Sequence, residues 1–182
     1  MGEVGPEQLL KRLAEGEPAA FAALFDRFGP RLFRAAQTLL GNAADAEDAV
    51  QEVFVALVRS RSRLWQVESL PAYLFASLRR SAGRIGERQA RAPRTSLNVA
   101  GEAIASRGES DAPGANERAH WLRMAVRRLP PEQREVIALK IDGELTFQEM
   151  AATLGISPHT AASRYRYALE KLREAARRES VE

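Results

Sequence analysis

The sequence contains no cysteine and only two histidines, which removes the residues that several classes of protein require. Without thiols, the 182-residue chain can form neither disulfide bonds nor thiolate metal sites. His120 and His159 lie far apart in the chain, and there is no HExxH motif, no P-loop and no dinucleotide-binding glycine pattern. We therefore expect a protein that is not an enzyme and that binds no cofactor or metal.

Long apolar runs are also missing. The opening stretch MGEVGPEQLLKRLAEGEP has no apolar run of the length that a signal peptide or a membrane span needs. The lack of cysteine agrees with a reducing compartment. Together these absences predict a cytoplasmic protein without membrane insertion.

The alternation of apolar and polar residues that is typical of β-strands is absent, and helical periodicity runs through almost the whole chain. One segment interrupts it, because residues 91–116 are rich in Pro, Gly, Ser and Asn and poor in large apolar side chains. We expect an all-α fold of two small helical domains, residues 1–90 and 117–182, joined by a flexible linker at 91–116. In the first domain we expect helices at 6–14, at 18–40 with a break or kink at Gly29-Pro30, at 45–61 and at 71–90.

Charge is distributed unevenly along the chain although the net charge is only +3. Residues 1–58 carry a net charge of −4, whereas residues 59–94 carry +7. Lysine is scarce, with 3 residues against 24 arginines, and arginine suits contacts with phosphate. An acidic block beside a basic one indicates two different partners, one of them a polyanion.

The C-terminal stretch LTFQEMAATLGISPHTAASRYRYALEKL has the layout of a helix-turn-helix. Thr146 and Glu149 are spaced for a capping box at the start of the first helix. Gly155 allows the tight turn, and Ser157 followed by Pro158 starts the second helix. The C-terminal domain is therefore expected to be a helix-turn-helix.

The second helix of this motif has one polar face near its start, where a recognition helix meets base edges in the major groove. The alternative is a solvated face, with Arg166 paired to Glu170 four residues later. The candidate DNA-contacting residues on or beside this face are His159, Thr160, Ser163, Arg164, Arg166 and Tyr167.

The stretch DAEDAVQEVFVAL, residues 45–57, is an amphipathic helix whose polar face is acidic. Val55 falls among the carboxylates, and an apolar residue ringed by acids can be the centre of an interface with a basic protein. A lone exposed valine is also ordinary. The candidate protein-contacting residues are Asp45, Asp48, Gln51, Glu52 and Val55.

The basic block combines arginines at three- and four-residue spacing with nearby aromatic residues, a combination that suits single-stranded DNA. For each aromatic residue separately, a place in the core is the alternative, with Trp65 closing the core beside Phe75. The candidate DNA-contacting residues of this block are Trp65, Arg79, Arg80, Arg84 and Arg88.

These stretches, in this order, resemble a bacterial RNA polymerase sigma factor of the extracytoplasmic-function (ECF) type. DAEDAVQEVF resembles the second conserved region, AAFAALFDRFGPRLFRAAQTLLG the helices before it, and LPPEQREVIALKIDGELTFQEMAATLGISPHTAASRYRYALEKLRE the fourth region. The resemblance implies that the acidic helix docks on the clamp helices of the largest subunit of core RNA polymerase, and that the C-terminal domain binds the flap of the other large subunit. It also implies that the basic block reads the −10 element, and that the C-terminal domain reads the −35 element.

The resemblance further implies an anti-sigma protein as the usual inhibitor, and a role in promoter recognition and strand opening rather than in nucleotide addition. The alternative that remains is a conventional helix-turn-helix regulator, which binds duplex DNA without being a polymerase subunit. A receiver domain of the kind often fused to such regulators needs alternating strands and helices, and the N-terminal half shows helical periodicity instead.

Overall fold

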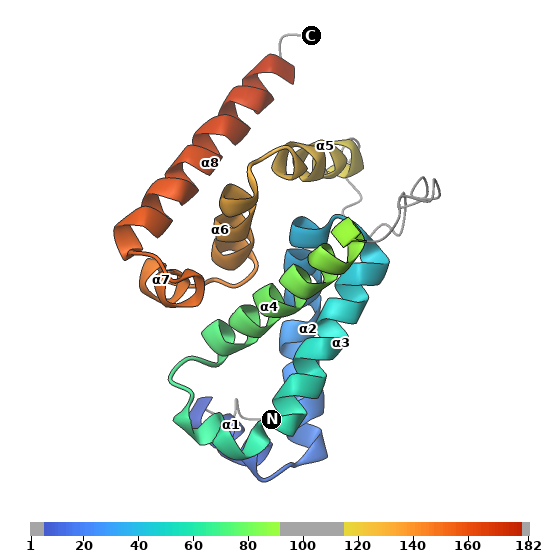
Figure 1. The fold of residues 1–182 in the computed structure, drawn as a ribbon, viewed down its shortest axis with the longest axis vertical. Helices are drawn as coiled ribbons and strands as arrows, with labels where there is room; N and C mark the ends of the chain where they lie inside the picture. The colour runs from blue at the N-terminus through green and yellow to red at the C-terminus, as the bar shows by residue number, and fades with distance from the viewer. Residues whose placement is uncertain (1–5, 92–114, 180–182) are drawn as a thin grey trace.

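The computed structural model describes residues 6–91 and 115–179, and every regular element in these ranges is a helix (Figure 1). None of the described helices has both the length and the apolar character needed to cross a membrane. The elements of the first part are α1 (Pro6–Ala14), α2 (Pro18–Leu40), α3 (Ala43–Arg59), the 3₁₀ helix η1 (Arg61–Gln66) and α4 (Leu70–Arg91). Those of the second part are α5 (Ala115–Arg127), α6 (Pro131–Ile141), α7 (Phe147–Leu154) and α8 (Pro158–Glu179).

Helix α2 has the predicted bounds, but it runs as one helix through Pro30, so the chain is not broken at Gly29-Pro30. A proline inside a helix removes one backbone hydrogen bond and costs about 3 kcal/mol. Phe28 and Leu32 on either side are both fully buried, whereas Pro30 itself is exposed. Core packing of the two flanking turns therefore holds the helix together across the proline, and the expected break does not occur.

The first part is built around α2, α3 and α4, which pack side by side (Figure 1). Asn42 caps α3, since its side chain accepts a hydrogen bond of 2.8 Å from the backbone N–H of Asp45. The sequence did not predict η1, which packs on α1 and buries Leu64. The main buried side chains contributed by these helices are Leu24, Leu32, Val53, Leu57, Leu74, Phe75 and Leu78.

The second part contains the predicted helix-turn-helix. Thr146 and Glu149 form the capping box of α7, with both reciprocal hydrogen bonds present. Gly155 has φ +68°, in the left-handed region that glycine adopts without strain. Ser157 then caps α8 by accepting a hydrogen bond of 3.0 Å from the N–H of Thr160. The local signals read from the sequence are therefore confirmed.

The two parts are packed against each other, with α6 and α7 lying along α2 and α4 (Figure 1). Val136, Leu139 and Met150 belong to the same continuous cluster of buried side chains as the core of the first part. Polar contacts surround this apolar centre, among them the ion pair between Arg79 and Glu135. Most of the expected linker, residues 92–114, lies outside the described residues, while Arg91 ends α4 and Ala115 begins α5.

Candidate nucleic-acid and protein interfaces

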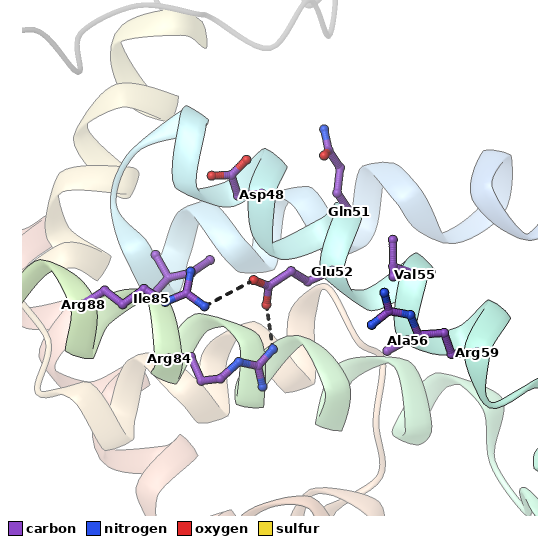
Figure 2. A pocket seen from close by; sticks show the side chains of 9 residues that line it. All are labelled: Asp48, Gln51, Glu52, Val55, Ala56, Arg59, Arg84, Ile85 and Arg88. Atoms are coloured by element: carbon purple, nitrogen blue, oxygen red, sulfur yellow. Dashed lines mark hydrogen bonds and ion pairs between the residues drawn. The ribbon is translucent and has the colours of Figure 1, made fainter.

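A groove of about 640 Å³ runs between α3 and α4, and it brings the predicted acidic and basic residues together (Figure 2). The sequence placed these residues on separate surfaces for separate partners. Helix α3 contributes Asp48, Gln51, Glu52 and Val55 to the groove, and α4 contributes Arg84 and Arg88.

Glu52 is the residue that joins the two sides of this groove. Its carboxylate accepts a hydrogen bond from the hydroxyl of Ser81 and another of 2.6 Å from Nη2 of Arg84. Nη2 of Arg88 lies 3.9 Å from the other carboxylate oxygen (Figure 2). The hydrogen bond from Ser81 lowers the pKa of Glu52 most, and the two arginines lower it further against an opposing effect of burial. Glu52 is thus an ionised group with three partners inside the chain.

The other acidic-face residues fall into two groups. Asp45 accepts hydrogen bonds from the side chains of Asn42 and Gln89, so it ties the start of α3 to the end of α4. Asp48 and Gln51 are exposed, and Val55 is 48% exposed beside them. The predicted pattern of an outward-facing valine among polar groups is therefore present, with Asp48 and Gln51 as the polar groups most open to a partner.

Two apolar residues near this face were not singled out from the sequence. Phe25 of α2 is exposed and its ring lies 5.1 Å from that of Phe54, measured between centroids. Val58, one turn after Phe54, is exposed as well. Phe54 itself is half-buried. The sequence signal for this patch was weak, because isolated apolar residues on a helix surface are common.

The structure places the predicted basic residues of α4 and the nearby aromatic residues in different environments. Trp65 is 70% exposed on η1, which excludes its role in closing the core, whereas Phe75 is fully buried. Arg79 pairs with Glu135 of α6 at 3.1 Å. Arg80 is exposed and donates a hydrogen bond only to Ser77 of its own helix within the described part of the chain.

The polar face of α8 is open to solvent near its start. His159, Arg166 and Tyr167 are exposed, while Thr160, Ser163 and Arg164 are half-buried. The opposite face docks through the buried Ala161 and Ala168 and through Tyr165, whose ring lies 5.9 Å from that of Phe147.

The predicted alternative of an Arg166–Glu170 pair is not adopted. The guanidinium of Arg166 lies 5.5 Å from the ring centroid of Tyr167, and no ion pair joins it to Glu170 among the described residues. Arg166 and Tyr167 therefore form a cation–π pair on the exposed side of the helix.

Comparison with known proteins connects the two parts of the chain to one family. The model of sigma-70 region 2 matches residues 24–91, and the model of sigma-70 region 4 matches residues 119–172. The chain is 34% identical over 169 residues to the RNA polymerase sigma factor CarQ of Myxococcus xanthus, covering 91% of this chain and 94% of CarQ. This chain belongs to the RNA polymerase sigma factors.

The sigma factor is of the ECF type. It is 30% identical over 168 residues to the ECF RNA polymerase sigma factor SigK of Mycobacterium ulcerans, covering 91% of this chain and 90% of SigK. Its fold is similar to that of CnrH, solved in complex with the cytosolic domain of CnrY, with a TM-score of 0.64, 24% identity, and coverage of 92% and 94%. It is also similar to RpoE, solved with the anti-sigma factor NepR from Bartonella quintana, with a TM-score of 0.69, 24% identity, and coverage of 86% and 96%.

Membership of this family decides between the two functions left open by the sequence. The protein is a transcription initiation factor that recognises promoters, and its sigma regions bind core RNA polymerase and promoter DNA. A conventional helix-turn-helix regulator is not favoured, since the N-terminal helices match sigma region 2.

Proposed function

We propose that this sigma factor docks on core RNA polymerase through the polar face of α3. Asp48, Gln51 and Val55 form the part of this face that is most open to a partner. An exposed apolar residue beside a carboxylate fits a partner surface of basic and apolar character. Asp45 and Glu52 complete the face, but both have hydrogen-bond partners within the chain, so a partner binds their carboxylates only when those contacts are exchanged.

The −10 element is proposed to contact the surface formed by Trp65 and the arginines of α4. Trp65 presents a ring on which an unpaired base can stack, and Arg80 presents an exposed guanidinium to the backbone. Arg79, Arg84 and Arg88 complete this surface. In the structure, Arg79 is paired with Glu135, and Arg84 and Arg88 are paired with Glu52. These three arginines can therefore contact DNA only when their ion pairs are broken.

The −35 element is proposed to contact the start of α8, with base edges facing its exposed polar side. His159, Arg166 and Tyr167 are the exposed members of the candidate set, and Thr160 and Ser163 lie behind them. Arg164, on the flank, fits a phosphate contact. In this proposal, residues 1–90 bind polymerase and the −10 element, residues 91–116 connect the two domains, and residues 117–182 bind the −35 element.

The observation that carries this proposal is the exposure of three chemically distinct surfaces: the acidic and apolar face of α3, Trp65 with Arg80, and the start of α8. The solved relatives CnrH and RpoE were captured with CnrY and with the anti-sigma factor NepR, and on that likeness an anti-sigma protein is the proposed inhibitor here. The proposed place of action is the cytoplasm, without membrane insertion and without catalysis of nucleotide addition by this chain.

The test is run-off transcription with purified core RNA polymerase, with and without this protein, on a library of genomic promoter fragments. New start sites that share a two-part upstream sequence are the expected result, and they identify both elements. Tight binding of duplex DNA by the protein alone, together with no new start sites, would contradict the proposal.

A further inference from the structure

Glu52 lies between the surface proposed for polymerase and the arginines proposed for DNA, and it contacts both sides of the groove (Figure 2). We propose that Glu52 exchanges its partners: in the free protein it holds Arg84 and Arg88, and a cationic side chain of the polymerase takes the carboxylate and releases both arginines to DNA phosphates. This inference rests on the proposed function, because it takes α3 as the polymerase-docking face.

The contacts at Glu52 have the properties that an exchange requires. The Arg84 contact is a hydrogen bond of 2.6 Å, and the Arg88 contact is a looser ion pair of 3.9 Å. The Glu52 side chain is 33% exposed, so a partner side chain can reach it from the groove. Arg84 and Arg88 are both more than half exposed, so their pairs with Glu52 are weak and screened by solvent. Replacing the two arginines by another cation therefore requires little free energy.

Ser81 holds the Glu52 carboxylate in place while its cationic partners are exchanged. Its hydroxyl hydrogen-bonds to the same carboxylate oxygen as Arg84, from a buried position on α4. This anchor is independent of the two arginines, so the carboxylate keeps its place on the groove floor when they leave. A carboxylate held in position but only partly covered is a suitable acceptor for an incoming ammonium or guanidinium group.

Asp48 supplies the attraction that favours the incoming cation. It lies one turn before Glu52, is exposed, and lines the same groove. The structure records no ion pair of Asp48 within the described residues. A cation that enters beside Asp48 is attracted by both carboxylates, whereas Arg84 and Arg88 then repel it. That repulsion drives the two arginines outward, which is the direction in which DNA phosphates can take them.

A competing role for Glu52 makes the opposite prediction. If the carboxylate instead positions Arg84 and Arg88 for DNA, its removal lowers DNA affinity. If it withholds them, its removal raises affinity. The sign of the change in the absence of polymerase therefore separates exchange from positioning.

The experiment uses the full-length protein, without polymerase, and a fluorescein-labelled single-stranded oligonucleotide of 20 nucleotides, a length that exceeds the footprint of one small domain. Fluorescence anisotropy gives the Kd over a range of salt concentrations. Glu52→Gln keeps the size of the side chain and one acceptor oxygen but removes its charge. Glu47→Gln is the matched control, since Glu47 is an exposed acid of the same helix outside the groove lining.

Glu52→Gln should bind the oligonucleotide several-fold more tightly than the wild type. The plot of log K against log salt concentration should steepen by about 0.7 for each released arginine, because each new phosphate contact displaces counterions. Glu47→Gln should leave the slope unchanged. Ser81→Ala, which loosens the anchor of Glu52, should shift the affinity in the same direction by a smaller factor.

Equal slopes for Glu52→Gln and Glu47→Gln, or weaker binding by Glu52→Gln, would overturn the exchange. Run-off transcription by the wild type with core polymerase tests the proposed function separately. Promoter-specific initiation together with equal slopes would leave the proposed function intact and reject the exchange alone. Absence of initiation would reject the proposed function, and with it the polymerase as the partner that enters the groove.

Discussion

The ion pair between Arg34 and Asp142 allows a sharp test of how the two parts of the chain are held together. Nε of Arg34 donates a hydrogen bond of 3.0 Å to Oδ1 of Asp142, and Nε of Arg31 donates one of 2.8 Å to the backbone carbonyl of Asp142. The Asp142 side chain is only 11% exposed, whereas that of Arg34 is 55% exposed. The pair therefore joins a buried acid to a base that is mostly in water.

The direction of the Asp142 pKa shift indicates which partner stabilises the structure. Burial raises the pKa of Asp142 above its ordinary value, and the hydrogen bond and charge of Arg34 offset this only in part. A raised pKa means that the folded state prefers the protonated acid, so the charge of Asp142 is tolerated rather than favourable at neutral pH. The free energy that Arg34 contributes is mainly compensation for this buried charge.

Two substitutions should consequently have different effects at pH 7. Arg34→Ala leaves a buried carboxylate short of a partner, which costs about 1–2 kcal/mol, at the lower end of the usual range because Arg34 is half in solvent. Asp142→Asn keeps an acceptor for Arg34 and removes the charge, so it should change the free energy of unfolding by less than about 0.5 kcal/mol. The double variant should recover about 1 kcal/mol of the loss caused by Arg34→Ala.

Urea denaturation followed by circular dichroism at 222 nm provides these free energies, with Arg63→Ala as the control. Arg63 is an exposed arginine for which no ion pair is recorded in the described part of the chain, so its removal should fall within about 0.5 kcal/mol of the wild type. The loss caused by Arg34→Ala should shrink as the pH is lowered from 7 through the raised pKa of Asp142 toward 3.8, because a protonated acid needs no cationic partner. Equal destabilisation by Arg34→Ala and Asp142→Asn, or strict additivity in the double variant, would refute this reasoning.

Three further predictions concern the proposed surfaces. Asp48→Arg should abolish co-purification with core polymerase while the melting temperature stays within a few degrees of the wild type, and Glu47→Arg should retain binding; normal co-purification of Asp48→Arg would remove the role of this face. Arg166→Ala should weaken binding to a −35 duplex, measured with polymerase present, by about 1–3 kcal/mol, as expected for a base contact. Arg164→Ala should weaken it by less, as expected for a phosphate contact. Unchanged affinity in both variants would contradict the recognition-helix assignment. Trp65→Ala should reduce opening of the −10 region, followed by permanganate reactivity, by about 1–3 kcal/mol without loss of stability, since the ring is mostly exposed; normal opening would exclude base stacking there.

The sequence predicted the elements of this fold where the signals are local. The capping box of Thr146 and Glu149, the turn at Gly155 and the cap at Ser157 each depend on residues within a few positions of one another. The apolar faces of the helices were also readable, because burial follows the helical period. The same holds for the polar start of α8, which the structure leaves open to solvent.

The features that the sequence did not predict depend on contacts between distant residues. The continuity of α2 through Pro30 requires the packing of Phe28 and Leu32 into a core that other helices complete. The contact of Asp142 with Arg34 spans 108 positions of the chain. Helical periodicity indicates that a face is polar, but it does not indicate which charges on different helices will meet.

The ion pairs of the arginines on α4 predict how strongly the free chain should bind single-stranded DNA. Of the four arginines proposed to contact the −10 element, Arg79 is paired with α6, and Arg84 and Arg88 contact Glu52. Among these four, only Arg80 has no ion pair within the described residues, and Trp65 is exposed at the start of the surface. Affinity for the phosphate backbone rises with the number of cationic contacts, so a chain in this arrangement should hold single-stranded DNA weakly. In the proposed exchange, a polymerase cation at Glu52 increases the number of available arginines, so binding of single-stranded DNA should strengthen when the protein docks on polymerase.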